Sequence, residues 1–197
     1  MKITFGGEGG VAIRRKSKSA TKSKSAKKAG AKKLAVKTGD GVSDKLLREQ
    51  LGKVLSWREA HADWKQALAG LDPAHRGVRP AGSPHSGWDL LEHVRLAQRD
   101  ILDFTVNPKH VSPDWPAGYW PKSLAPADDA EWEKSVREFF RDLQEMERLV
   151  SNPRTDLLAR IKHGTGQTFL RQVLLLIDHN SYHLGQLVLV RRLLGAW

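Results

Sequence analysis

Cysteine is absent from the sequence of 197 residues. This absence excludes disulfide bonds, cysteine-ligated zinc and thiol nucleophiles, so any metal site must be built from histidines and carboxylates. It also favours a cytoplasmic location, which we expect for this protein. Long apolar runs are absent too. The mean hydropathy is -0.49, and polar residues interrupt every apolar stretch well before the roughly 20 residues that span a bilayer. We therefore expect no contact with a membrane.

Acidic residues are scarce at the N-terminal end, where basic residues dominate. Residues 1–43 hold twelve of the 33 Lys and Arg but only two acids, so they carry a formal charge of +10 out of the total of +11. This segment is rich in Lys, Ser, Ala and Gly and has no apolar face, which predicts a disordered basic tail. The tail could bind nucleic acid by counterion release, or it could be a solvated extension or the product of an upstream start codon. The nearly neutral remainder, residues 44–197, is expected to form one domain.

The domain shows the 3.6-residue periodicity of α-helices and no alternating strand pattern. We predict four helices, over residues 44–71, 88–105, 128–150 and 168–194. Ser43 or Asp44 would cap the first helix and Ser86 the second. Proline and glycine break the pattern between the first two helices, and a long loop with five of the nine prolines separates the next two. The predicted fold class is all-α, a four-helix bundle.

Two histidines lie four residues apart in the last predicted helix. His179 and His183 would project from one side of the helix, one turn apart, and this spacing suits two ligands of one metal ion. The same stripe includes Leu176 and Leu187 and faces the interior of the bundle, where imidazoles without partners would be costly. A metal ion would satisfy them, but so would hydrogen bonds to carbonyl groups. A zinc protease is excluded, because its mechanism needs a glutamate at the position of Asn180.

A third histidine, His93, lies on the inward stripe of the second predicted helix. Three imidazoles from two helices would leave a coordination position open, as catalytic metal sites do. His61 is expected on the inner face of the first helix between Trp57 and Trp64, where it could act as a catalytic proton shuttle or be a hydrogen-bonded core residue. Five polar residues could accept hydrogen bonds from the ligands, namely Asp89, Glu92, Asp178, Asn180 and Gln186. The remaining histidines, His75, His85, His110 and His163, are expected at the surface or at the rim of a pocket.

Two segments of the sequence resemble the paired histidine motifs of the DinB-like (YfiT-like) superfamily of metalloenzymes. They are SGWDLLEH over residues 86–93 and DHNSYHLGQ over residues 178–186, within a resemblance that runs from about residue 44 to the C-terminus. The resemblance implies that His93, His179 and His183 bind one divalent ion with open positions. Imidazole ligands suit both Zn²⁺ and Ni²⁺. It also implies a metal-dependent hydrolase or a transferase that uses a low-molecular-weight thiol, acting on a small molecule. The basic tail has no counterpart in this pattern.

The aromatic and apolar residues outside the motifs predict a pocket and a dimer. Trp115, Tyr119 and Trp120 of the long loop would wall a partly apolar pocket for the small molecule. The last helix is apolar nearly all round, which predicts a homodimer. Gly185 in the middle of this helix would be explained by close helix packing. The alternative function is a non-enzymatic binding protein, whose tail contacts nucleic acid and whose bundle is a dimerising body.

Deletion of residues 1–43 should separate the two functions. We expect the truncated protein to keep its metal and to lose any salt-sensitive DNA binding, because the deleted segment carries nearly all of the net charge. Fluorescence anisotropy with a DNA duplex at low salt measures the binding, and elemental analysis measures the metal. If the full chain does not bind DNA even at low salt, the nucleic-acid hypothesis is wrong.

Overall fold

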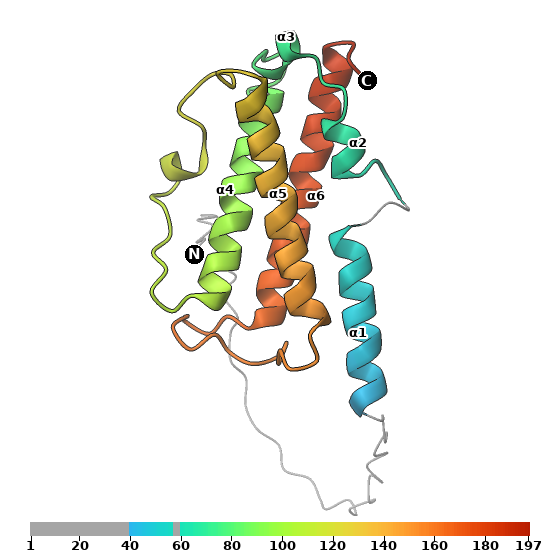
Figure 1. Ribbon diagram of the computed structural model, residues 1–197, viewed down its shortest axis with the longest axis vertical. Helices are drawn as coiled ribbons and strands as arrows, with labels where there is room; N and C mark the ends of the chain where they lie inside the picture. The colour runs from blue at the N-terminus through green and yellow to red at the C-terminus, as the bar shows by residue number, and fades with distance from the viewer. Residues whose placement is uncertain (1–39, 57–59) are drawn as a thin grey trace, which may run out of the picture.

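A computed structural model describes residues 40–56 and 60–197 of the chain, without the side chains of residues 40 and 41. The long helices are α1 (Asp40–Leu55), α4 (Gly87–Val106), α5 (Asp129–Ser151) and α6 (Phe169–Leu193). The short ones are α2 (Trp64–Leu68), α3 (Pro73–Arg76) and the 3₁₀ turn η1 (Ala117–Tyr119). Helices α4, α5 and α6 run side by side, and α1 packs mainly against α5 (Figure 1).

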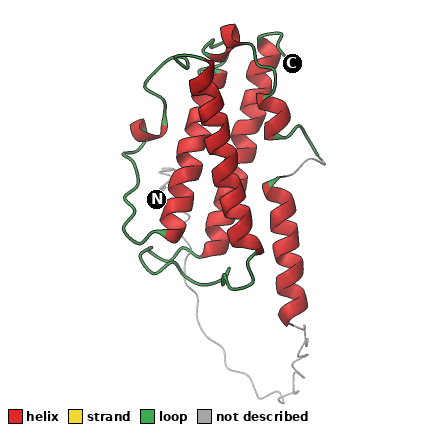
Figure 2. Ribbon diagram, viewed as in Figure 1, coloured by secondary structure: helices red, strands yellow, loops and turns green. Residues whose placement is uncertain are grey.

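The prediction of an all-α fold is confirmed. The described part of the chain contains helices and loops, with one isolated bridge between Arg160 and Thr168 and no strand (Figure 2). None of its helices combines the length and apolar character that crossing a membrane would need. Residues 1–39 of the predicted basic tail lie outside the described residues. Because α1 begins at Asp40, before the expected boundary, a truncation that spares this helix should end at residue 39.

Three helices start after a residue whose side chain caps them, and one of these residues is the predicted cap Ser86. At the start of α4, the Ser86 hydroxyl accepts from the Asp89 amide (3.1 Å) and the Asp89 carboxylate accepts from the Ser86 amide (2.8 Å), which forms a capping box. The side chains of Asp128 and Thr168 cap α5 and α6 in the same general way. The predicted bounds of these three helices are confirmed to within one residue at each end.

The first predicted helix is wrong at both ends: Ser43 and Asp44 lie within α1 instead of capping it, and the helix does not continue to residue 71. Helix α1 ends at Leu55, and the chain begins α2 after Asp63. The Asp63 carboxylate accepts from the Gln66 amide (2.7 Å) and the Gln66 side chain accepts from the Asp63 amide (3.0 Å). This capping box starts a new helix, and the sequence Asp63-Trp64-Lys65-Gln66 carried that signal. The apolar periodicity misses the break because Trp64 and Leu68 are buried in α2 as they would be in a longer helix.

Helices α1 and α2 follow each other along one side of the bundle (Figure 1). Two arginines attach them to it. Arg48 of α1 donates to the carbonyl oxygens of Val150 (2.8 Å), Asn152 (2.9 Å) and Thr155 (2.7 Å), at and beyond the end of α5. Arg191 of α6 donates to the carbonyl of Ala67 in α2 (2.7 Å) and to that of Ala69 after it. A helix C-terminus leaves carbonyl groups unpaired, so a guanidinium placed there both hydrogen-bonds them and complements the helix dipole.

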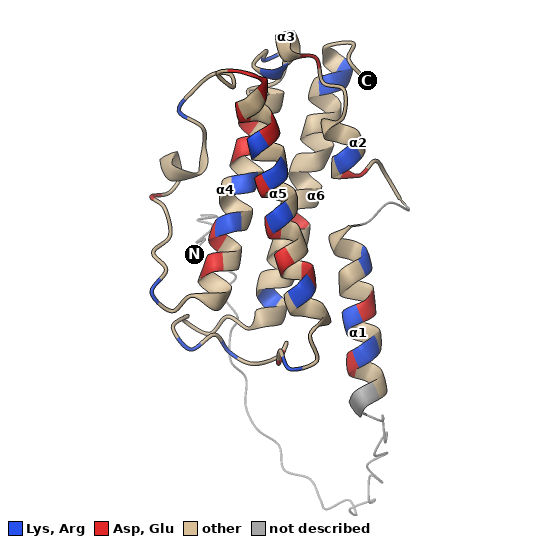
Figure 3. Ribbon diagram, in the orientation of Figure 1, with Lys and Arg blue, Asp and Glu red and all other residues tan. Residues whose placement is uncertain are grey.

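The core lies between α4, α5 and α6. Its fully buried side chains include Leu90 and Val94 of α4, Phe139 and Met146 of α5, and Leu176 and Leu187 of α6. Charges of both signs alternate on the visible faces of α4 and α5, whereas α6 is mostly uncharged (Figure 3). Two α4 arginines pair with α5 carboxylates, Arg95 with Glu138 and Arg99 with Asp142. These contacts fix α4 against α5 and α6, and they position the side chains that α4 and α6 direct at each other.

Candidate metal centre

Three histidine side chains from α4 and α6 converge inside the bundle. The Nε2 atom of His93 lies 3.1 Å from Nε2 of His183 and 3.2 Å from Nε2 of His179. Two ligands about 2.1 Å from an ion, at an angle of about 90–110°, lie about 3.0–3.4 Å from each other. The two pairs that include His93 are therefore spaced as neighbouring ligands of one metal ion, and the candidate ligand atoms of all three residues lie within 4.8 Å of one another. His93 and His183 are buried and His179 is half-buried.

The outer nitrogens of two of these rings are hydrogen-bonded to oxygens. Nδ1 of His93 donates to the Tyr119 carbonyl (2.8 Å), and Nδ1 of His183 donates to Oε1 of Gln186 (2.6 Å). A carbonyl or amide oxygen can only accept, so both Nδ1 atoms carry the hydrogen and both Nε2 atoms carry a lone pair. Two lone pairs 3.1 Å apart repel each other unless a cation lies beside both. The donor set therefore fits a metal ion, and a three-histidine group of this kind could bind one.

Burial keeps the three imidazoles neutral. It lowers the pKa of His179 to about 3 and that of His183 to about 4, and the neighbouring imidazoles add to the decrease. Burial also lowers the pKa of His93. Metal ligation requires the deprotonated ring, so the rings are in the form that ligation needs at neutral pH.

The long loop between α4 and α5 supplies the environment of His93. Trp120 stacks on the His93 ring at 4.0 Å between centroids, and it also stacks with His85 at 4.3 Å. Tyr119, whose carbonyl accepts from His93, is itself anchored, because its hydroxyl donates to Asp100 (2.9 Å). His110 Nε2 donates to the other oxygen of Asp100 (2.7 Å). Asp100 thus ties this loop to the same face of α4 that carries His93.

Asp100 and His110 were not predicted as part of the site. A signal for Asp100 was present, because it lies seven residues after His93 and hence on the inward stripe of α4, where an unpaired carboxylate would be costly. His110 gave no such signal. Its contact depends on how the loop folds back, which local periodicity does not report. Of the other histidines, His163 is exposed and donates to the Phe104 carbonyl (2.6 Å).

The five predicted outer acceptors have different partners in the structure. Gln186 accepts from His183, as expected. Asp89 binds Arg79 and Glu92 binds Arg95, so these carboxylates hold arginines rather than imidazoles. Asp178 is exposed, whereas Asn180 is buried and donates to Gln98.

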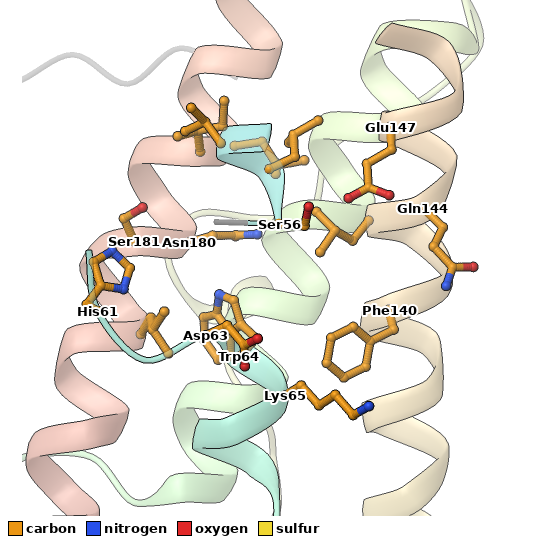
Figure 4. Close-up of a pocket in the computed structure, with 16 residues that line it drawn as sticks. Ser56, His61, Asp63, Trp64, Lys65, Phe140, Gln144, Glu147, Asn180 and Ser181 are labelled. Atoms are coloured by element: carbon orange, nitrogen blue, oxygen red, sulfur yellow. The ribbon is translucent and has the colours of Figure 1, made fainter. Parts of the chain in front are cut away.

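The structure does not bring His61 to the three-histidine group. The expectation that it lies on the inner face of a helix is wrong, because α1 ends before it. His61 is exposed in the connection to α2 and donates to the Ala62 carbonyl (2.8 Å). It lines a cavity of about 240 Å³ between α1, α2, α5 and α6, together with Glu147 and Asn180 but none of the three clustered histidines (Figure 4). Trp57, its expected neighbour, lies outside the described residues. A proton-shuttle role for His61 stays a prediction.

Comparison with known families matches the protein-family model of the DinB superfamily to residues 56–187, more than half of the chain. The chain belongs to the DinB superfamily. The match includes all three clustered histidines, and it begins after α1 and the basic segment. No curated protein and no solved structure matches the chain. The DinB resemblance of the two histidine motifs is thereby confirmed, while the substrate has to be argued from the site itself.

The metal-free DinB-superfamily chain should lose stability as the pH falls from about 6.5 to about 4. Imidazoles of the unfolded chain take up protons near pH 6.5, whereas the folded-state pKa is about 3 for His179 and about 4 for His183. Only the unfolded state therefore gains protons in this interval, so these histidines contribute stability above pH 6.5 that is lost on acidification, by up to about 1.4 kcal/mol per pH unit for each ring.

Urea unfolding in the presence of a chelator, at pH 7 and pH 5, measures this effect. A His179→Leu variant serves as the control, because its unfolding free energy should change less with pH than that of the wild type. Equal pH dependence in the two proteins would contradict the assignment of these low pKa values.

Proposed function

We propose that His93, His179 and His183 hold one divalent ion, Zn²⁺ or Ni²⁺, and that the protein is a metal-dependent enzyme acting on a small molecule. The supporting observation is the convergence of three Nε2 atoms, two of them with outer nitrogens bonded to oxygens. Three protein ligands leave room for further ligands, as in catalytic zinc sites.

Two reactions fit such a site, hydrolysis and thiol-dependent S-transfer. When bound, the ion would supply Lewis acidity and lower the pKa of water or of a low-molecular-weight thiol. The residues of this chain would keep the ligands neutral by burial and hold His93 through the Tyr119 carbonyl. The rings of His93 and His85 cover the faces of Trp120, which is half-buried, so its exposed edge would contact an apolar part of the substrate. Trp115 stands nearby with its ring 5.6 Å from that of Tyr119. We therefore propose a small, partly apolar substrate.

The alternative is a non-enzymatic binding protein with a tail that contacts nucleic acid. Its support is the charge of residues 1–43. That charge lies before the residues that match the family, whereas the three-histidine group lies within them. The metal-dependent function is therefore the one that we favour.

Purified protein should contain one equivalent of zinc or nickel, and the variants His93→Ala, His179→Ala and His183→Ala should each lose it, because two imidazoles hold the ion more weakly than three. His163→Ala is the matched control, since His163 is exposed and bonded to a backbone carbonyl, and it should keep the metal. Elemental analysis measures the content. Wild-type protein that stays metal-free after incubation with zinc, nickel and manganese would refute the proposed function.

We also propose a homodimer formed through the outer face of α6. Leu174, Tyr182, Leu189 and Leu193 are exposed on one arc of this helix, and the exposed Gly185 lies within the same arc. The explanation of Gly185 by packing within the chain is wrong, because a Cβ built there would meet nothing within 4 Å. A mid-helix glycine costs stability, and close approach of a second copy of α6 would account for it.

Replacement of Gly185 by leucine should convert the dimer to a monomer. The monomer has open space for the side chain, so its thermal stability should not fall, whereas a partner helix would be displaced. Arg137→Leu, at an exposed position of α5, controls for the added apolar surface and should stay dimeric. Light scattering at micromolar concentration measures the mass. A monomeric wild type would contradict the proposed dimer.

A further inference from the structure

The third histidine of the group, His179, lacks the outer hydrogen bond that His93 and His183 have. Only three buried side-chain polar atoms in the described part of the chain have no hydrogen-bond partner, and two of these are Nδ1 of His179 and Oδ1 of Asn180. They belong to consecutive residues of α6. When Nε2 of His179, which lies 3.2 Å from Nε2 of His93, keeps its lone pair for the ion, its Nδ1 carries the hydrogen and needs an acceptor. Oδ1 of Asn180 is an acceptor and needs a donor.

Asn180 ends a chain of side-chain amides whose direction is fixed. Nε2 of Gln98 donates to the backbone carbonyl of Phe139 (2.7 Å), and this carbonyl can only accept. Gln98 must therefore present its oxygen to Asn180, whose Nδ2 donates to it (2.9 Å). The free end of the Asn180 amide is consequently an oxygen. Gln98 is fully buried and Asn180 is 6% exposed, so bulk water does not compete for these groups.

Neither Nδ1 of His179 nor Oδ1 of Asn180 has a hydrogen-bond partner in the structure, although both atoms are buried and belong to consecutive residues. One can serve as a donor and the other is an acceptor, so a contact between them would satisfy both.

We propose that Asn180 is a positioning residue of the metal centre, and that its Oδ1 accepts from Nδ1 of His179 so that the ring presents Nε2 to the ion. This inference rests on the proposed function, because it takes His179 as a ligand. The chain from Phe139 through Gln98 and Asn180 then ties a ligand of α6 to both α5 and α4. Each of the three rings is held as the same tautomer by an oxygen on Nδ1, and such outer contacts fix the orientation of metal-bound imidazoles.

Asn180 also lines the cavity of about 240 Å³ that His61 lines (Figure 4). A substitution there could change packing without involving the metal, so the test needs variants that separate the acceptor from the volume. Asn180→Leu removes the amide and keeps a side chain of similar size. Asn180→Asp keeps an acceptor oxygen but loses the donor to Gln98. Gln172→Leu is the matched control, because Gln172 is another buried amide of α6, two turns before Asn180 and bonded to Arg171.

The affinity of the full-length protein for Zn²⁺ is measured by competition with a chromophoric chelator, and the absorption spectrum of the Co²⁺-loaded protein reports the ligand geometry. We expect Asn180→Leu to weaken Zn²⁺ binding by about 10–100-fold, the usual effect of losing an outer acceptor. Asn180→Asp should bind Zn²⁺ about as tightly as the wild type while melting at a lower temperature. Gln172→Leu should bind Zn²⁺ as the wild type does.

A double-mutant cycle tests the role of Gln98. If Gln98 acts through Asn180, the variant Gln98→Leu/Asn180→Leu should have the same Zn²⁺ affinity as Asn180→Leu alone, because the second change has no further route to the ion. Additive losses would show that Gln98 acts independently of Asn180 and would overturn the continuous chain.

The Zn²⁺ affinities of the Asn180 variants decide whether Asn180 positions His179. Wild-type Zn²⁺ affinity and an unchanged Co²⁺ spectrum in Asn180→Leu would overturn the proposal. Equal weakening in Asn180→Leu and Asn180→Asp would also overturn it, because packing rather than an acceptor oxygen would then be the cause. In both cases the wild type still binds metal, so the proposed function survives. A wild type that binds neither Zn²⁺ nor Ni²⁺ overturns the proposed function and this inference together.

Discussion

Three neutral imidazoles that face one another in the interior of a bundle impose the constraint on which this site depends. Each ring has one N–H and one lone pair, and the lone pairs of His93 and His183 approach to 3.1 Å between their nitrogens. That contact is tolerable when a cation compensates the lone pairs and when every N–H is held on the far side. Burial lowers the pKa of all three rings, so protonation of the imidazoles is unfavourable at neutral pH. A metal ion is the cation that this chemistry favours.

The surrounding structure supplies oxygen acceptors for the outer nitrogens of His93 and His183, from two different parts of the chain. A loop carbonyl accepts from His93 and a side chain one turn further along α6 accepts from His183, and we propose that the neighbouring Asn180 amide does the same for His179. The loop is the least regular of these supports, yet Asp100 holds it through both Tyr119 and His110. Irregular backbone near the site is thus fixed by hydrogen bonds to the regular helix that bears His93. The ion pairs between α4 and α5 stabilise the same helix from its other side.

Much of this arrangement could be predicted from the sequence, because it depends on local signals. The caps at Ser86 and Thr168 set where α4 and α6 begin, and the helical repeat then directs His93, His179 and His183 inward. The break between α1 and α2 could not be predicted from apolar periodicity, because that periodicity continues across the capping box at Asp63. Contacts between distant segments could not be predicted either, such as that of Gln98 with the Phe139 carbonyl. A polar residue at a buried position predicts that a hydrogen-bond partner exists, but the three-dimensional packing decides which group that partner is.

The three histidines of the group are divided unequally between two helices, and this division has a mechanical consequence. The separation of His179 and His183 is set by the pitch of α6, which varies little while the helix is intact. The position of His93 relative to this pair depends instead on how α4 and α6 pack. A small sliding of one helix past the other would therefore move Nε2 of His93 relative to the pair on α6 and leave the spacing within that pair nearly unchanged. The geometry of the three-histidine group is thus set by helix pitch within α6 and by helix packing between α4 and α6.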